Sequence, residues 1–208
     1  AVIDLDGIQA QKLAKYLSET YSVNCLGVSA DVLDKDSLTE AKKHINDNLG
    51  EIDFLINGAG GNSPQATTKV EQMDATSISE LSATFFGLQK EGFQKVFDLN
   101  FMGTILPTMV FSTDMLENKK GAVINISSMN SFKPLTKIPA YSAAKASINN
   151  FTQWLAVHLA KTGIRVNAIA PGFFLTNQNR FLLVDENTGH PTPRGEKIIA
   201  NTPMGRYG

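Results

Sequence analysis

The sequence predicts an α/β fold in which helices cover both faces of a parallel sheet. Short apolar runs alternate with segments of helical periodicity along most of the chain, a pattern typical of βαβ units. Polar and glycine-rich residues follow the apolar runs, which is where ligands bind in such sheets. The 208 residues, 42% of them hydrophobic, suit a single domain, 1–208, with a sizeable core.

The order of the elements follows from local patterns. Strands are expected where apolar residues form short runs, at 1–3, 23–28, 52–56, 122–126 and 164–169. Helices are expected where apolar residues recur every three or four positions, at 9–21, 35–49, 91–118 and 139–162. Pro107 can kink the third helix. The polar residues 62–80 indicate a loop or lid, and the chain beyond 172 is polar with short helical patches.

Composition excludes several classes of protein. The formal net charge of −1 argues against nucleic-acid binding, which requires a basic stripe. With Cys25 as its one cysteine, the chain has no disulfide framework, and we expect a cytoplasmic protein. The most apolar stretch, 101–111, is interrupted by glycine and proline, so we expect no membrane span. We expect no metal site, because the three histidines are scattered, at His44, His158 and His190.

Three residues in the second half of the chain predict proton transfer. Tyr141 and Lys145 are four positions apart, which places them on one face of the expected helix. A free phenol titrates near ~10, and the lysine charge is expected to lower the pKa of Tyr141. The Ser128 hydroxyl, just after a strand, is suited to hold a carbonyl oxygen beside the phenol. Taken alone, Tyr-x-x-x-Lys also occurs on ordinary solvated helices, so the interpretation depends on the surrounding residues.

Other strand ends predict a nucleotide site. Asp4 can accept hydrogen bonds from a ribose 2′-OH and repel a 2′-phosphate, and Leu5 supplies no positive charge for a phosphate. NAD is therefore expected over NADP. Asp31 and Val32 are suited to an adenine ring, and the glycines of 57–61 let a flat ligand approach the backbone. Each of these features alone also fits an ordinary turn.

Asn100 is a polar residue inside an apolar part of the 91–118 segment. Asparagine is a mediocre helix former, and a buried amide needs a hydrogen-bond partner. Helix capping does not explain it at this position. We therefore expect a role for Asn100 near the site.

Together these residues make the chain resemble the short-chain dehydrogenase/reductases, over its whole length. Ser128 precedes Tyr141 by thirteen positions, as is usual in that family. The resemblance implies a Rossmann-like, doubly wound, three-layer α/β/α sheet, an NAD-dependent enzyme and a homotetramer formed through the two long helices. It implies that the catalytic residues are Ser128, Tyr141, Lys145 and Asn100. It implies that the residues lining the cofactor are Asp4, Leu5, Asp31, Val32, Asn57, Gly58, Ala59, Gly60, Ile126, Tyr141, Lys145, Pro171, Gly172, Phe174 and Thr176.

The chain departs from the family pattern in two respects. Gly58 stands where the family usually has a second asparagine. The first strand, with its TGxxxGxG pyrophosphate loop, and the last strand of the family are not found in this sequence. We therefore expect the natural protein to carry further residues at both ends, with 173–208 forming a substrate lid.

Within the family, residues 127–145 and 170–180 look most like those of enzymes that act on sugar acids, above all on D-fructuronate and D-mannonate. A sugar acid needs many hydrogen-bond partners and a cation for its carboxylate. Such groups are supplied by Asn62, Asn130, Lys133, Lys137, Gln178, Asn179 and Arg180, and the substrate contacts are expected from Asn62, Ser128, Asn130, Tyr141, Gln178 and Arg180. Three alternatives remain: a gluconate, polyol or ketoacyl enzyme of the same fold, a non-catalytic binding protein, and an inactive fragment.

Overall fold

The computed structural model describes residues 1–176 and 179–208, apart from the side chain of Thr76. It divides into two compact units, residues 1–169 and 170–208. The prediction of a single domain stays a prediction.

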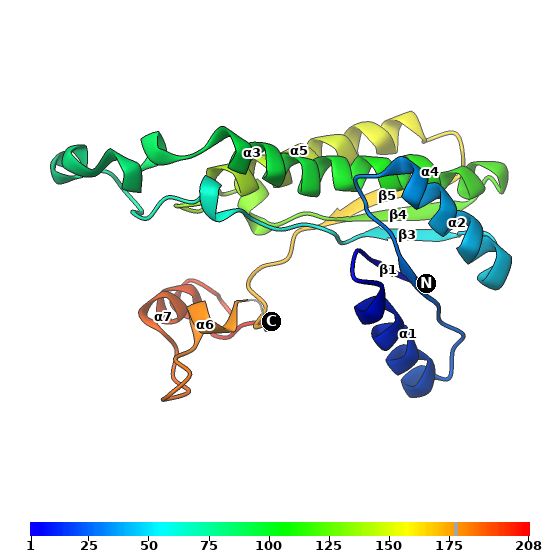
Figure 1. The fold of residues 1–208 in the computed structure, drawn as a ribbon, viewed down its shortest axis with the longest axis horizontal. Coiled ribbons are helices and arrows are strands. Elements are labelled where there is room, and N and C mark those ends of the chain that lie inside the picture. Colours follow the sequence, from blue (N-terminus) through cyan, green and yellow to red (C-terminus); the bar gives the residue numbers. More distant parts are fainter. Residues whose placement is uncertain (177–178) are drawn as a thin grey trace. The chain divides into compact units, whose positions relative to one another are not determined.

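Unit 1 contains five strands, all paired in parallel (Figure 1). One sheet joins β1 (Val2–Asp4) to β2 (Gly27–Ser29). The other has the order β3-β4-β5 and comprises β3 (Phe54–Asn57), β4 (Gly121–Ile126) and β5 (Ile164–Ile169). The parallel pairing confirms the predicted Rossmann-like α/β class.

Long helices follow the strands. They are α1 (Gly7–Tyr21), α2 (Lys35–Leu49), α3 (Lys90–Phe97), α4 (Gly103–Glu117) and α5 (Pro139–His158). Asp6 and Asp34 cap α1 and α2 by accepting backbone N–H bonds, which fixes where these helices begin. Between them and after β4 lie short segments: η1 (Pro64–Ala66), η2 (Ala75–Ala83), η3 (Phe85–Gly87), η4 (Asp98–Met102) and η5 (Met129–Ser131).

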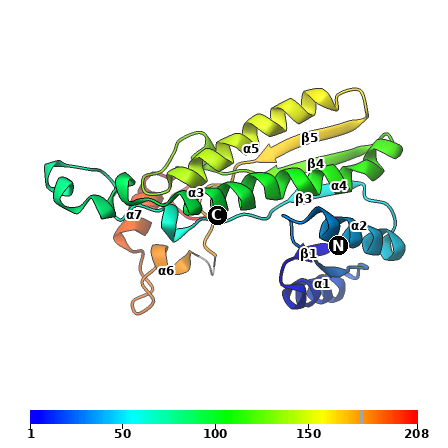
Figure 2. The same ribbon diagram turned by 45° about the horizontal axis from the view of Figure 1, so that its top comes forward.

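One hydrophobic core joins α2, α4 and α5 to the β3-β4-β5 sheet. It includes Leu38 of α2, Phe111 of α4, Val123 of β4 and Leu155 of α5, all buried. Figure 2 shows α4 and α5 lying along this sheet. The strand register pairs Asn57 of β3 with Asn125 of β4. The two strands therefore end together, and the residues that follow them leave from one edge of the sheet.

Three sequence expectations needed correction at their boundaries. The strand predicted at 23–28 is confined to Gly27–Ser29, because its partner β1 offers only three residues for pairing. The helix predicted at 91–118 contains the π-helical η4 between α3 and α4, whereas α4 continues through Pro107. The helix predicted at 139–162 ends at His158 and turns before β5.

Unit 2 contains two short helices, α6 (Arg180–Leu183) and α7 (Pro193–Ala200). An isolated antiparallel bridge joins Val184 to Pro191. The Gly208 N–H donates to the Phe173 carbonyl at 2.9 Å, so the two ends of the unit meet. This agrees with the predicted polar segment with short helical patches.

A buried ion pair ties α2 to α4. The Lys42 ammonium lies 2.5 Å from the Asp114 carboxylate, whose side chain is 4% exposed. Asp114 also accepts hydrogen bonds from the Asn46 amide and the Ile52 backbone N–H, each at 3.0 Å. Burial raises the pKa of Asp114, but the hydrogen bonds and the Lys42 charge outweigh this effect and hold it below its usual value.

We predict that Asp114→Ala lowers the free energy of unfolding at pH 7 by about 3–5 kcal/mol, because it leaves Lys42 partly buried without a partner. Because the folded pKa of Asp114 is depressed, its contribution is present above the unfolded value and is lost as the pH falls through the folded one. Urea unfolding at pH 7 and pH 3 measures both effects. Glu117→Ala, at an exposed acid on the same helix, is the control; an equal loss in both variants would contradict the prediction.

Candidate active site

Ser128, Tyr141 and Lys145 come together where β4 ends and α5 begins. Ser128 follows β4 and caps η5, and its residue is 9% exposed. Tyr141 lies in the first turn of α5, with Lys145 one turn further. The Lys145 ammonium is 5.7 Å from the centroid of the Tyr141 ring. The predicted serine, tyrosine and lysine therefore form one cluster within unit 1.

The pKa of Tyr141 differs from the sequence expectation. Burial raises the pKa of the phenol, and a side-chain hydrogen bond with Ser128 opposes this only in part. The predicted lowering by Lys145 is not found. The reason is geometric and electrostatic: the lysine amine donates to the Ile126 carbonyl at 2.8 Å, and burial disfavours charge on both groups.

Lys145 is the buried amine of the site. Its residue is 3% exposed, and burial lowers the pKa of the amine to about 8. One of its hydrogens forms the hydrogen bond to the Ile126 carbonyl. The remaining hydrogens are available to a ligand hydroxyl.

The serine turn is fixed to α5 by side-chain hydrogen bonds. The Ser128 oxygen accepts the Asn130 backbone N–H at 3.2 Å, so one of its lone pairs is occupied and its own hydrogen is directed elsewhere. Ser127 donates to the Lys145 carbonyl at 3.3 Å, and Asn149 donates to Ser131 at 2.8 Å. This network was not anticipated from the sequence, although the run of serines and asparagines at 127–131 was its visible sign.

Asn100 clamps the glycine loop that follows β3. It is fully buried within η4. Its amide donates to the carbonyls of Gly61 and Val96 at 2.7 and 2.8 Å, and its oxygen accepts the Gly61 N–H at 3.3 Å. The expectation that Asn100 acts near the site is thus matched by a specific contact. Its part in a proton relay stays a prediction.

Gly60 fits against Asn100 and Lys145 without space for a side chain. A Cβ atom on Gly60 would lie 2.7 Å from the Asn100 amide oxygen and 3.2 Å from the Lys145 amine. A Cβ on Gly58 would meet no atom within 4 Å. Gly60 therefore packs the loop against Asn100 and Lys145, and Gly58 leaves open space beside it where a flat ligand has access to the backbone.

Asn57 belongs to a buried polar network that sequence analysis did not identify. Its amide donates to Thr108 of α4 at 2.8 Å and to Asn125 of β4 at 2.9 Å. Asn125 in turn donates to Thr152 of α5 at 2.9 Å. Asn57 thus links β3 to α4 and β4, and Asn125 extends the network to α5. Because the Asn57 side chain is used in these bonds, its backbone is the part that can contact a ligand. Paired asparagines at strand ends were the available signal.

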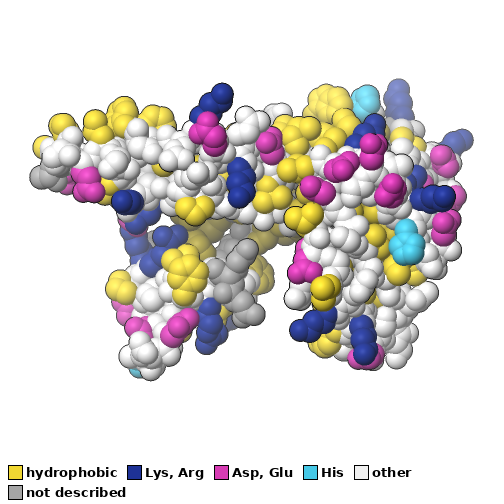
Figure 3. All heavy atoms as spheres, viewed as in Figure 1, with side chains coloured by type: hydrophobic (Ala, Val, Ile, Leu, Met, Phe, Trp, Pro, Cys, Tyr) yellow, Lys and Arg dark blue, Asp and Glu magenta, His cyan; other side chains and the backbone are white. Residues whose placement is uncertain are grey.

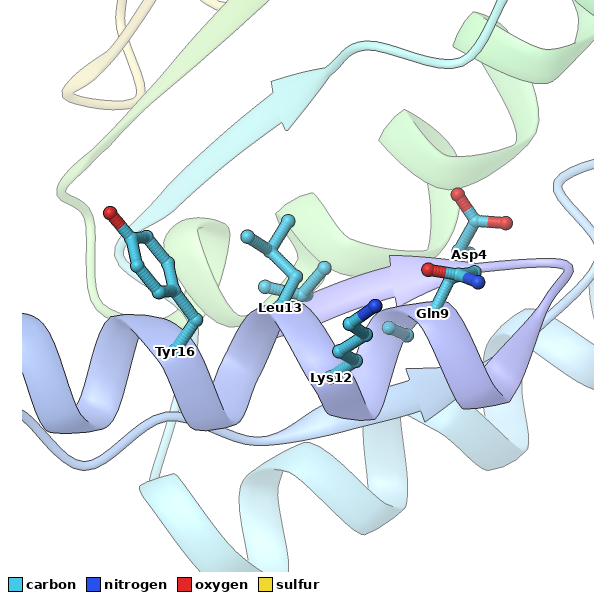
Figure 4. Close-up of a pocket in the computed structure, with 7 residues that line it drawn as sticks. Asp4, Gln9, Lys12, Leu13 and Tyr16 are labelled. Carbon is cyan, nitrogen blue, oxygen red and sulfur yellow. The ribbon is translucent and has the colours of Figure 1, made fainter.

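The predicted adenosine residues lie at the ends of β1 and β2. The Asp4 carboxylate accepts the Asp6 N–H at 2.9 Å, and Leu5 is exposed. Asp31 accepts the Leu33 N–H at 2.8 Å, and Val32 packs against Gly103 at the start of α4. Asp4 also borders an open hollow along β1 and α1 (Figure 4), of about 440 Å³, which is lined by Val2, Asp4, Gln9, Ala10, Lys12, Leu13 and Tyr16.

The remaining predicted residues are more dispersed. Asn62 is exposed and donates to Thr67 at 2.9 Å, while Asn130 is 6% exposed and its side-chain oxygen has no hydrogen-bond partner in the described structure. Gln178 lies outside the described residues. Several others belong to unit 2, namely Pro171, Gly172, Phe174, Thr176 and Arg180. There, Asn179 ties the backbone of Phe174 and Thr176 together.

Among the described residues, no group of three or more His, Cys, Asp or Glu side chains is arranged to hold a metal ion. In the same part of the chain no helix has the length and apolar character needed to cross a membrane.

Unit 1 exposes apolar side chains in several patches (Figure 3). On α5, Trp154 is 58% exposed and stacks between Phe151 and His158, with ring centroids 6.3 and 4.8 Å apart. The 62–88 segment also exposes apolar residues, including Ile78, Phe85 and Phe86. Assembly into a homotetramer stays a prediction.

The family model for short chain dehydrogenases matches residues 1–187. The chain therefore belongs to the short-chain dehydrogenase family of oxidoreductases. Its relatives include an uncharacterized oxidoreductase of Haemophilus influenzae, 51% identical over all of this chain and 72% of the relative's length, and the uncharacterized oxidoreductase UxuB of Bacillus subtilis, 49% identical over all of this chain and 73% of the relative.

A solved structure shares the same fold. It is that of a proposed D-mannonate oxidoreductase from Haemophilus influenza with bound NAD. It is 50% identical in sequence and superposes with a TM-score of 0.89 over 99% of this chain and 72% of that one. The family and fold implied by the sequence motifs are thereby confirmed.

We predict that Gly60→Ala lowers the free energy of unfolding by about 1–3 kcal/mol, because the added methyl group overpacks the contact with Asn100 and Lys145. Gly58→Ala is the matched control, since its methyl group enters open space. Thermal unfolding of both variants without ligand measures the difference. Equal stability of the two variants would show that the loop does not pack as described.

Proposed function

We propose that this protein is an NAD(H)-dependent oxidoreductase for sugar acids, interconverting D-fructuronate and D-mannonate. The observation that carries the proposal is the cluster of Ser128, Tyr141 and Lys145 beside a glycine loop clamped by Asn100. The similarity to the proposed D-mannonate oxidoreductase solved with NAD supports both the cofactor and the substrate class.

The residues of the cluster divide the proton chemistry among them. During reduction, the Tyr141 phenol donates its proton to the carbonyl oxygen, and a raised pKa keeps the phenol protonated at neutral pH. Ser128, whose lone pair is occupied by the Asn130 N–H, donates a hydrogen bond to the same oxygen and stabilises the developing alkoxide. When bound, NAD(H) supplies or accepts the hydride.

Lys145 has two roles in the proposal. Its free hydrogens bind a ribose hydroxyl of the cofactor, and its position beside Tyr141 keeps a cation within reach of the phenolate that forms when the proton leaves. Its pKa of about 8 makes the amine sensitive to its surroundings, because a bound anionic cofactor favours the charged form.

The cofactor preference rests on Asp4 and Leu5. An exposed carboxylate at the end of β1 favours a ribose hydroxyl and repels a 2′-phosphate, so NADH is preferred over NADPH. Asp31, Val32 and the backbone of 57–60 complete the nucleotide half. In unit 2, Phe174 and Thr176 serve the nicotinamide end as part of the 173–208 lid.

Substrate hydroxyls are bound by Asn62, Asn130, Gln178 and Arg180 in this proposal. The buried side-chain oxygen of Asn130 has no hydrogen-bond donor among the described residues. Because an unpaired buried acceptor is costly, this oxygen is the favoured partner for a substrate hydroxyl. The runner-up function is that of a gluconate 5-dehydrogenase or another polyol or ketoacyl reductase of the same family. A non-catalytic role is disfavoured by the assembled Ser128, Tyr141 and Lys145 cluster.

Side-by-side turnover of candidate substrates tests the proposal. NADH and NADPH oxidation would be followed with D-fructuronate, D-tagaturonate, 5-keto-D-gluconate and an acetoacetyl thioester. We expect the highest kcat/KM with D-fructuronate and NADH. A preference for the thioester would support the ketoacyl alternative, and no turnover with any of the four would contradict the sugar-acid proposal.

We predict that Tyr141→Phe lowers kcat by about 10²–10⁴, the usual contribution of general acid–base catalysis. NADH affinity, measured by fluorescence titration, is expected to change little, because only the phenolic oxygen is removed. Tyr21→Phe, at an exposed tyrosine at the end of α1, is the control. A Tyr141 variant with more than about a tenth of the wild-type kcat would refute the acid–base assignment.

A further inference from the structure

Lys137 has an unusual backbone conformation just before the catalytic helix. Its φ angle is 72°, in the left-handed region that residues with a Cβ atom disfavour. Two other non-glycine residues in the described part of the chain share it, Ser22 and Lys119, with φ of 54° and 52°. Ser22 is the C-cap of α1, and Lys119 follows the C-cap of α4; a left-handed residue is common at such a helix C-terminus. Lys137 instead precedes a helix, so capping does not account for it.

The conformation at Lys137 is braced from another part of the chain. The Thr68 N–H donates to the Lys137 carbonyl at 2.9 Å. On the other side, Ile138 is the N-cap of α5, and its carbonyl accepts the Ser142 N–H at 3.1 Å. The 62–70 loop after β3 and the first turn of α5 thus hold Lys137 between them. Strain that the surroundings hold in place is characteristic of functional sites.

The Lys137 side chain is a cation without an acidic partner. The residue is partly buried, and it forms no ion pair with a carboxylate in the part of the chain that the structure describes. The sequence around it contains no acid: between residues 121 and 160 the charged Lys, Arg, Asp and Glu residues are Lys133, Lys137 and Lys145 alone. An excess of positive charge without acids favours an anionic ligand.

From these observations we infer that Lys137 binds the carboxylate of the sugar-acid substrate, and this inference rests on the function proposed above. Lys137 comes four residues before Tyr141 in the chain, so it is close to the proposed proton donor without taking part in the proton transfer. In D-fructuronate the carboxylate lies at the opposite end of the carbon chain from the reacting carbonyl. The substrate therefore needs a cation separate from Lys145, whose amine is buried and bonded to Ile126.

Lys137→Met tests the inference, because methionine has an unbranched side chain of similar length but no charge. Like lysine it has a Cβ atom, so the left-handed backbone is equally disfavoured in both proteins. For the full-length protein with NADH, we expect KM for D-fructuronate to rise about 10- to 100-fold, as for the loss of a hydrogen bond to a charged group. We expect kcat to change less than about threefold, because the proton-transfer groups are untouched. Turnover of D-fructose, a ketose without a carboxylate, is expected to be as slow in the variant as in the wild type.

Two further variants separate binding from structure. Lys161→Met removes an exposed lysine just beyond the C-terminal end of α5 and is expected to leave KM for D-fructuronate nearly unchanged. Lys137→Gly relieves the left-handed backbone, so it is expected to raise the midpoint of thermal unfolding while reproducing the KM defect. The glycine variant also serves if Lys137→Met folds poorly.

Each outcome has a separate meaning. An unchanged KM in Lys137→Met and Lys137→Gly, or an equal rise in Lys161→Met, would overturn the role of Lys137 while leaving the sugar-acid function intact. An equal loss with D-fructuronate and D-fructose would show that the residue acts on structure and not on the carboxylate. A wild-type enzyme that reduces ketoses but no keto acid would overturn the proposed function itself.

Discussion

The register between β3 and β4 is the constraint on which the site depends. Asn57 and Asn125 are paired across the two strands, and the Asn57 amide donates directly to the Asn125 oxygen. A shift of β3 by one residue would turn the Asn57 amide to the other face of the sheet and remove it from Thr108 and Asn125. Since the glycine loop leaves β3 and the serine turn leaves β4, this register sets where each of them begins.

Burial then sets the protonation of the site. On α5, near the end of β4, Lys145 is buried and Tyr141 is partly buried, and burial shifts the pKa of each group toward its neutral form. A protonated phenol is the form needed to donate a proton to a carbonyl, and a lysine with a pKa of about 8 can gain or lose its charge with small changes around it. Desolvation thus sets the pKa of both groups, and the charge of a bound ligand shifts these pKa values further.

Much of this could be predicted from the sequence. The alternation of apolar runs and helical patterns indicated a parallel sheet, and Ser128 after a strand, with Tyr141 and Lys145 on the following helix, indicated a site there. The boundaries that were wrong depend on partners: the 23–28 strand is short because β1 is short, and the 91–118 helix contains a π-helical segment where Asn100 turns to Gly61. A local pattern contains no information about such partners.

The sequence by itself determined the class of fold and the family, because hydrophobic periodicity and motif spacing are local properties. It also predicted which residues are catalytic. Tertiary structure alone decided the direction of the Tyr141 pKa shift and the hydrogen bonds between Asn100 and Gly61. It also decided that the Asn57 side chain is used in buried hydrogen bonds. It also showed the strained backbone of Lys137, held by Thr68 from a distant loop. Each of these depends on burial or on contacts between segments far apart in the chain, and those arise only when the chain has folded.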